Sequence, residues 1–548
     1  MTKFVHLSND IYLHLFKYFE LADIFSIFYD INININSVIN ENLVSYDLSI
    51  VSRQKFNYYI RHLSSNPQYI YSLTISNEFH NDLIQLCLNQ FEIKNCTHLH
   101  SLTINEPTFI QSKTIIRNLP YLKQLAYLSI YSKKYDDYDD EKLLDCVNLI
   151  LNSRNYSLKH IIVPYIGSMD NIFTTAIVED LTIGLYNLDQ LRKLFYHIPH
   201  IKRLNVTIVK HRNSFWTDQD LLLIPESNLW TVPDLIYLKL TVENNKSITF
   251  EQIDFLLKRL PSLEHFLFGC HDQKLINGKQ WEQILSSLVS LTNFDFYCRF
   301  PLENDNYDIK KLLFSFETKF CVEFNCLRLP CNSVIIFTKS YPQSHLEITW
   351  NQLQKDLTQE NSNAPLLLDA FQLNINSISP SLEYYKFQYY LCQTISTSNV
   401  KQLYLYCSNT CKISKIFLLN LLSMYNIQTL TLSLPQLMTT VFTSARTHSR
   451  CYINSVHYLT WKHKHPITEH NIHDFLASFQ NVKSVTLHLE KLNNVQFNIA
   501  KLLSEKPHII FFNIHWNYEN DWNLWLENQL HFDQLFYEKT NNSICIWT

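Results

Sequence analysis

The segment Leu235-Ile236-Tyr237-Leu238-Lys239-Leu240 contains the pattern that decides the fold, apolar-x-x-apolar-x-apolar. This sextet recurs along the chain, with its middle apolar residue at Leu73, Leu102, Leu128, Ile161, Leu181, Leu204, Leu238, Phe266, Phe294, Leu327, Leu403, Leu430, Leu459, Val485 and Phe512. Successive middle residues are 20 to 34 residues apart up to Leu327 and 26 to 29 apart from Leu403 onward. Repeats of this length indicate similar units that stack on one another, because a single unit cannot bury its own apolar face.

The segments between the sextets have the periodicity of helices. In residues 250–260, Ile253, Leu256, Leu257 and Leu260 follow the spacing i, i+3, i+4, i+7, which places them on one helical face. Pro261 then ends the helix before the next sextet begins. The sequence therefore predicts an alternation of one short strand and one helix.

The sextet resembles the L-x-x-L-x-L strand of the leucine-rich repeat family. The resemblance implies an α/β horseshoe solenoid, with parallel strands on the concave face and helices outside. The family continues to Asn or Cys three residues after the last apolar position, where this chain has residues such as Glu78, Pro107 and His271. Cysteine falls one place early, for example at Cys270. This departure leaves open whether the chain has the buried asparagine ladder of regular repeats.

The x residues of the sextets are expected to face away from the apolar core, because side chains alternate across a strand. Exposed Tyr and Arg are favoured anchor residues in protein interfaces. We expect a protein target to contact an unspecified subset of these x residues. The candidates are Arg203, Tyr237, Lys239, His265, Asp295, Tyr297, Arg328, Tyr404, Tyr406, Lys462 and His488. The alternative is an ordinary solvated sheet face rich in strand-forming residues.

The N-terminal segment differs from the repeats, since its apolar residues follow the spacing of three short amphipathic helices. The order Leu7-Ser8-Asn9-Asp10-Ile11, Leu15-Phe16-Lys17-Tyr18-Phe19 and Asp23-Ile24 resembles an F-box, with Ser8 in place of the usual proline. The resemblance implies docking on the Skp-type adaptor of a cullin–RING ubiquitin ligase. It assigns to the helical core or to the adaptor interface Leu7, Ile11, Leu15, Phe16, Phe19, Ile24 and Ile31. The alternative is an N-terminal cap that covers the first repeat.

These patterns predict four parts: an F-box-like three-helix domain over 1–50, a connecting helix or linker over 51–64, repeats over 65–515 and a C-terminal cap over 516–548. The repeats are expected to be irregular over 330–398, around Leu346-Glu347-Ile348 and 382–387 or as an insertion. Trp516, Trp522 and Trp525 predict an amphipathic helix in the cap.

The composition argues against several classes of functional site. The chain has 4 glycines in 548 residues, and none stands in a phosphate-binding or nucleophile-elbow motif. Positions with positive φ are therefore expected to fall mostly to Asn and Asp. The 13 scattered cysteines and the grouped His463, His465, His470 and His473 lack standard metal-ligand spacing, so we expect reduced thiols, solvated or structural histidines, and no metal or other cofactor.

The net charge of −4 argues against nucleic acid, and no signal peptide or membrane span is recognisable. We therefore expect a cytoplasmic or nuclear, non-catalytic substrate-recognition subunit of an SCF-type ligase. The alternative is a protein-binding scaffold without a role in ubiquitin transfer.

Overall fold

The computed structural model describes residues 7–16, 18, 24, 27–28, 31–41, 44–49, 51–78, 82–131, 149–152, 157–165, 177–185, 187–208, 230–243 and 248–301. Further along it describes residues 324–329, 333–338, 345–349, 372–376, 400–406, 427–433, 456, 458–463, 476, 481–489, 509–516, 536–540 and 543–547. The chain divides into unit 1, Met1–Leu275 with Lys279–Phe294, and unit 2, Ile276–Gly278 with Asp295–Thr548.

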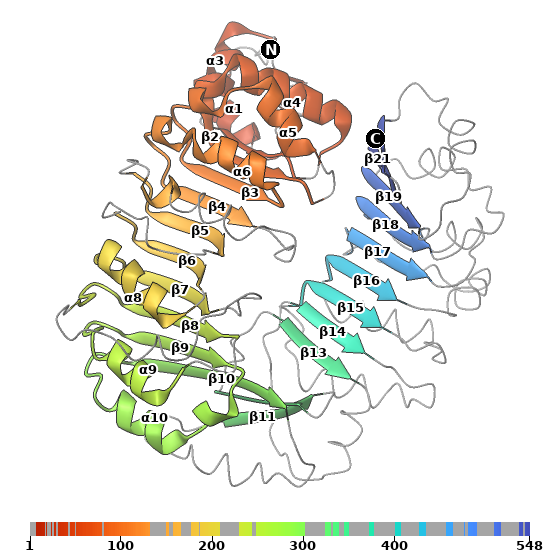
Figure 1. Cartoon of the computed structure of the whole chain (residues 1–548). Helices are drawn as coiled ribbons and strands as arrows, with labels where there is room; N and C mark the ends of the chain where they lie inside the picture. Colours follow the sequence, from red (N-terminus) through yellow and green to blue (C-terminus); the bar gives the residue numbers. More distant parts are fainter. Residues whose placement is uncertain are drawn as a thin grey trace. The chain divides into compact units, whose positions relative to one another are not determined.

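Unit 1 contains a parallel sheet whose strands follow one another in chain order (Figure 1). The strands are β1 (Val44–Asp47), β2 (Ile70–Ser76), β3 (Ser101–Asn105), β4 (Tyr127–Tyr131), β5 (His160–Tyr165), β6 (Asp180–Leu185), β7 (Arg203–Ile208), β8 (Tyr237–Val242) and β9 (His265–Cys270). Equivalent sextet positions are aligned, so that Leu204 of β7 pairs with Leu238 of β8, which pairs with Phe266 of β9. This register confirms the predicted repeat strands of unit 1.

A bend at the start of each sextet explains why its first two apolar residues are three apart. Residues three apart in a straight strand would point to opposite faces. At the bend, the carbonyl oxygen of Lys202 accepts hydrogen bonds from the N–H groups of both Ile236 and Tyr237, at 2.9 and 3.2 Å. The carbonyls of Lys401 and Lys483 accept the same pair of bonds from the following repeats in unit 2. The bend turns both apolar residues inward.

Helices pack against the apolar side of this sheet, α5 on β2 and α8 on β6. The helices after the N-terminal segment are α4 (Arg53–Ser65), α5 (Leu83–Gln90), α6 (Phe109–Ile116), α8 (Leu188–His197), α9 (Phe250–Leu257) and α10 (Gly278–Leu285). Short 3-10 turns are η2 (Pro67–Tyr69), η3 (Ile93–Asn95), η4 (Leu119–Tyr121) and η7 (Gln273–Leu275). The predicted face of α9 is buried at Ile253, Leu256 and Leu257. The core therefore lies between helices and strands, as the two periodicities predict.

The repeat array begins earlier than predicted. Strand β1 pairs in parallel with β2, with Tyr46 opposite Leu73, and α4 lies between them along the chain. Leu43, Tyr46 and Leu48 form a sextet that the sequence analysis missed, because tyrosine was not counted as an apolar middle residue. Tyr46 is nevertheless buried. The array therefore begins before residue 65, and the helix predicted over 51–64 is α4, which connects the first two strands.

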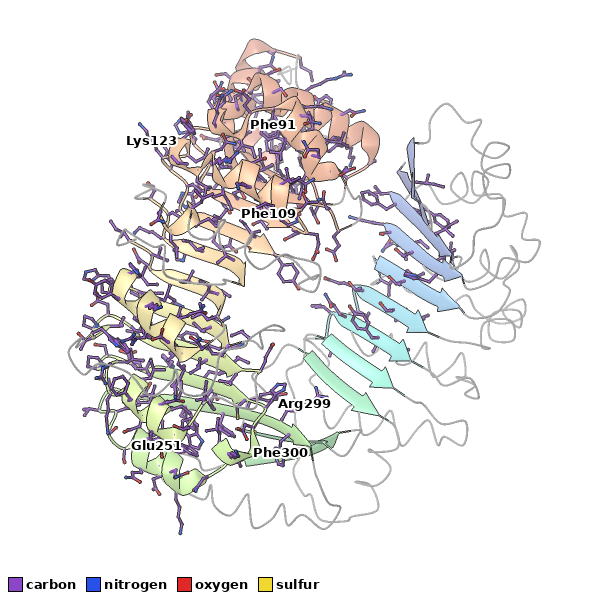
Figure 2. All side chains as sticks on the ribbon, viewed as in Figure 1. Phe91, Phe109, Lys123, Glu251, Arg299 and Phe300 are labelled. Carbon is purple, nitrogen blue, oxygen red and sulfur yellow. The ribbon has the colours of Figure 1, made fainter. Side chains whose placement is uncertain are left out.

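Several helices begin with the same cap, in which a Thr or Asn is followed three residues later by Gln. Thr108 accepts a hydrogen bond from Gln111 N–H, and the Gln111 side chain accepts one from Thr108 N–H. Thr249 and Gln252 form the same capping box at α9. Figure 2 labels one residue between the threonine and the glutamine of each box, Phe109 on α6 and Glu251 on α9. Each box satisfies N–H groups that the helix itself leaves unpaired.

A buried asparagine links two of these repeats. Asn77 follows β2, and its side-chain carbonyl accepts a hydrogen bond from Ile84 N–H at 3.0 Å. Its amide donates to Oε1 of Gln111 at 2.9 Å, so it also contacts the capping box of the next helix. Asn77 lies one residue before the position where the leucine-rich repeat pattern has asparagine. The chain thus retains an asparagine link here, shifted by one residue.

Replacing Asn77 with leucine is expected to lower the free energy of unfolding by about 1–3 kcal/mol, because Ile84 N–H loses its buried acceptor. Urea denaturation of the variant measures the effect. Asn89→Leu on the exposed side of α5 is the matched control, and an equal loss in both variants would contradict the role of Asn77.

The N-terminal segment contains α1 (Asn9–Phe16) and α3 (Ile33–Glu41), which pack against each other. Tyr12 is buried, although the sequence analysis did not assign it to the core. The rings of Phe16 and Phe28 lie 5.3 Å apart, and Ile35 of α3 is also buried. These helices form a small core before β1, in which α1 buries Tyr12 and leaves the predicted Ile11 exposed.

Unit 2 contains a second parallel ladder (Figure 1). Its strands are β13 (His345–Thr349), β14 (Gln372–Asn376), β15 (Gln402–Tyr406), β16 (Thr429–Ser433), β17 (Tyr458–His463), β18 (Ser484–Leu489) and β19 (Phe511–Trp516). The sextets centred on Leu403, Leu430, Leu459, Val485 and Phe512 pair in register, which confirms the repeats from residue 400 onward. Within the predicted irregular segment, β13 and β14 continue this ladder, and residues 382–387 lie outside the described part.

Two regions of unit 2 depart from the repeat. Strand β10 (Asn293–Pro301), which crosses the boundary between the units, and β11 (Phe324–Leu329) each pair antiparallel with β12 (Ser333–Thr338). The sextet around Leu327 is therefore a hairpin strand, and predicting it as a parallel repeat strand was wrong. After β19, the strands β20 (Phe536–Thr540) and β21 (Ser543–Trp547) add an antiparallel edge. Trp516 ends β19, whereas Trp522 and Trp525 lie outside the described residues.

The shortage of glycine has a different consequence from the one predicted. Among the described residues with positive φ, the non-glycine residue is Glu106, with φ of 55°, and no glycine adopts positive φ. The expectation that Asn and Asp would take such positions is therefore wrong for this part of the chain. Cys87, Cys96, Cys270 and Cys298 are buried and form no disulfide, so these thiols pack as small apolar side chains.

Candidate functional site

The strand face of unit 1 is a set of aligned side chains on β5 to β9 that point away from the helices. Its first row contains His160, Asp180, Arg203, Tyr237 and His265, which are register partners on consecutive strands. Its second row contains Thr182, Asn205, Lys239 and Leu267. Flanking residues of each strand are buried, whereas these rows are exposed or half-buried. The repeat thus places chemically different side chains side by side.

The first row is joined by weak polar contacts. Asp180 lies 3.7 Å from both Nδ1 of His160 and Nε of Arg203. The Arg203 guanidinium lies over the ring of Tyr237, 4.9 Å from its centroid. Exposed pairs of this kind contribute about 0–1 kcal/mol each. They therefore add little to the stability of the fold.

Beside these rows, two lysines form ion pairs with one glutamate. The Glu179 carboxylate accepts from Lys159 Nζ at 2.8 Å and from Lys202 Nζ at 2.9 Å. Hydrogen bonds from Lys159 and then Lys202 lower the pKa of Glu179 to about 2. Both lysines therefore share one carboxylate, and the cluster stays ionised at neutral pH.

Lys239 differs from these lysines. No described residue forms a hydrogen bond or ion pair with its ammonium group, and burial lowers the pKa of Lys239 below its usual value. Its neighbour on β9 is the half-buried side chain of Leu267, which removes water from one side of the lysine. A desolvated cation without a counter-charge is unfavourable unless something supplies that charge.

The structure brings four of the predicted contact residues together in unit 1: Arg203, Tyr237, Lys239 and His265. Tyr297 was wrongly predicted to be exposed, since it is 2% exposed. The prediction failed because the sextet around Phe294 lies in β10, where Phe296, Tyr297 and Cys298 are all buried. Asp295 on the same strand is half-buried.

The remaining predicted contact residues lie in unit 2. Arg328 lies on the hairpin strand β11 opposite Val334, so its placement on a repeat strand was wrong. Lys462 of β17 and His488 of β18 are register partners, and the same row continues to His515. Tyr404 and Tyr406 lie on β15, with Tyr404 half-buried.

The predicted N-terminal residues are divided between core and surface. Ile24 is buried, and Leu7, Leu15 and Phe16 are half-buried. Ile11 and Ile31 are 48% and 47% exposed, and Phe19 lies outside the described residues.

The sequence analysis missed Asn205, Thr207 and Thr241 as members of the strand face. They occupy the same kind of x position as Lys239, so the sextet register alone could have identified them. They were passed over because a search for interface residues favours large aromatic and charged side chains.

Among the described residues, no three His, Cys, Asp or Glu side chains gather to hold a metal ion. No described helix is long and apolar enough to cross a membrane.

Comparisons with known proteins find weak similarities. No protein-family model matches the sequence, and no curated protein matches it. Among solved structures, the chain is similar to the leucine-rich repeat-containing protein LegL7 from Legionella pneumophila, with 12% identity and a TM-score of 0.26 over 50% of this chain and 98% of that one. It is also similar to the TLR13–ssRNA13 complex, with 10% identity and a TM-score of 0.23 over 75% of this chain and 58% of that one. Because these likenesses are weak, the fold rests on the strand register described above.

Proposed function

We propose that the protein is a non-catalytic repeat scaffold that binds a protein partner on the strand face of unit 1. The observation that carries this proposal is the alignment of Arg203, Tyr237, Lys239 and His265 on three adjacent strands. Parallel strands hold these side chains on a rigid, open surface, and repeat proteins use such extended surfaces for binding. Tyr and Arg are also enriched among residues that dominate interface energetics.

Site-specific photo-crosslinking tests the proposed surface. A photoreactive phenylalanine analogue is placed at Tyr127 or His160 on the strand side, and at Ile110 or Tyr196, which are exposed on helices α6 and α8. We expect the strand-side positions to crosslink a common protein in cells, identified by mass spectrometry, and the helix positions not to crosslink it. Crosslinking of that protein from the helix positions alone, or of none from the strand side, would reject the proposal.

A second candidate function is substrate recognition in an SCF-type ubiquitin ligase, with the N-terminal helices bound to a Skp-type adaptor and the cullin complex. One observation favours it: Ile11, Ile27 and Ile31 are 48%, 50% and 47% exposed, although each is strongly apolar. Apolar side chains left exposed on a small helical segment are typical of a surface that a partner covers. The resemblance to an F-box supplies the identity of that partner.

Ile11→Asp and Ile31→Asp test this second function, because these residues are exposed and their replacement preserves the N-terminal core. If the adaptor binds here, each variant is expected to lose at least tenfold in affinity for purified Skp adaptor, since burying a charge opposes binding. Isothermal titration calorimetry measures the affinity. Wild-type chain that is folded and does not bind the adaptor would exclude the ligase role and leave the scaffold function intact.

A further inference from the structure

The environment of Lys239 gives the strand face a chemical preference. Its nearest positions on β8 are Tyr237 and Thr241, and its register partners are Asn205 on β7 and Leu267 on β9. The diagonal positions are occupied by Arg203, Thr207, His265 and Gly269. None of these eight neighbours carries a carboxylate. The only acidic group that contacts one of them among the described ion pairs is Asp180, at 3.7 Å from Arg203.

Each polar side chain around Lys239 can donate a hydrogen bond. Nδ2 of Asn293 lies 2.8 Å from Nδ1 of His265. Because an amide nitrogen can only donate, Nδ1 accepts and Nε2 of the neutral ring carries the proton. The hydroxyls of Thr207 and Thr241 and the amide of Asn205 add further donors. Lysine, arginine and these donors together match the acceptor-only chemistry of a carboxylate.

We propose that the Lys239 cluster, formed by Arg203, Asn205, Tyr237, Lys239, Thr241 and His265, binds the carboxylates of an acidic segment in the protein partner. This inference rests on the proposed scaffold function and specifies the chemistry of its partner. A bound Asp or Glu supplies a counter-charge that no described residue gives Lys239, and Leu267 and Tyr237 shield the resulting ion pair from water.

An acidic peptide fits this surface better than a nucleic acid. Nucleic-acid binding uses a broad stripe of Lys and Arg on one face. Here the neighbouring lysines Lys159 and Lys202 already share the carboxylate of Glu179, and Arg203 lies beside Asp180. The uncompensated charge is therefore local to Lys239, on a scale that suits one or two side-chain carboxylates.

Binding of labelled peptides to the full-length chain tests the proposal. The probes are a short peptide of alternating Glu and Ser, the same peptide with Gln in place of Glu, and a single-stranded RNA. We expect the Glu peptide to bind and the Gln peptide to bind at least tenfold more weakly, as for loss of a charge-assisted hydrogen bond. Fluorescence anisotropy at two salt concentrations measures each affinity.

Lys239→Met keeps the aliphatic stem and removes the charge, and it is expected to weaken the Glu peptide about tenfold. Lys258→Met is the matched control, because Lys258 pairs with Asp254 at the end of α9, away from the strand face. Equal effects in the two variants, equal binding of the Glu and Gln peptides, or tighter binding of the RNA would overturn the inference. If the crosslinks from the strand side persist while these results fail, the scaffold function stands without the acidic partner.

Discussion

Replacing Trp281 with alanine is expected to lower the free energy of unfolding of unit 1 by about 3–5 kcal/mol. Trp281 is 1% exposed, and its ring centroid lies 4.9 Å from that of Phe268 and 5.3 Å from that of Phe294. Phe250 contacts it edge to face at 5.4 Å. The substitution leaves a cavity among rigid rings that cannot collapse to fill it.

The indole also makes a directed contact. Its Nε1–H donates to the carbonyl oxygen of Leu275 at 2.9 Å, so Trp281 also holds η7 by a hydrogen bond. Urea denaturation measures the loss. Trp281→Phe retains most of the ring volume and loses this hydrogen bond. It is expected to lose less unfolding free energy than Trp281→Ala. Val289→Ala is the control, since Val289 is 99% exposed. Similar losses at Trp281 and Val289 would show that the aromatic cluster does not stabilise unit 1.

Acidification from pH 6.5 to 4 is expected to cost unit 1 about 3 kcal/mol of unfolding free energy through His62 alone. Burial lowers the pKa of His62 from 6.5 to about 4, and its Nδ1 lies 2.7 Å from the Tyr46 hydroxyl. The folded-state pKa is below the unfolded value. As the pH falls through this window, His62 therefore becomes protonated in the unfolded chain and stays neutral in the folded chain. The stability is fully present above pH 6.5.

His62→Gln removes this titration. The unfolding free energy of the wild type minus that of the variant should therefore decrease as the pH falls. Carboxylates titrate equally in both proteins and cancel in that difference. The matched control is His98→Gln, which replaces an exposed histidine in the same way. Urea midpoints measured across the window give the result. Parallel curves for wild type and His62→Gln would show that the buried imidazole does not couple to folding.

Much of the fold follows from local periodicity. The spacing of Leu235, Leu238 and Leu240 can be satisfied only by burying all three, and the intervening helices carry a matching apolar stripe. Stacking of successive units is therefore already implied by the sequence. The candidate surface also follows, in part, because the residues between buried positions must face outward. Arg203, Tyr237, Lys239 and His265 could be selected in this way.

Other features depend on non-local pairing. The segment around Leu327 has the same sextet as its neighbours, yet it pairs antiparallel with β12. A six-residue pattern specifies which side chains are buried, and it does not specify the strand partner or its direction. The same limit explains the burial of Tyr297, whose x position predicted exposure.

The sequence by itself determined the alternation of strands and helices, the inward residues of each repeat and the absence of standard nucleotide-binding motifs, because these depend on residues close together in the chain. The tertiary structure decided that β1 starts the array, that Asn77 meets Gln111, and that the register neighbours of Lys239 on β7, β8 and β9 carry no carboxylate. These features depend on register between segments about one repeat apart. That register is fixed by packing and hydrogen bonding across the sheet, which no single repeat contains.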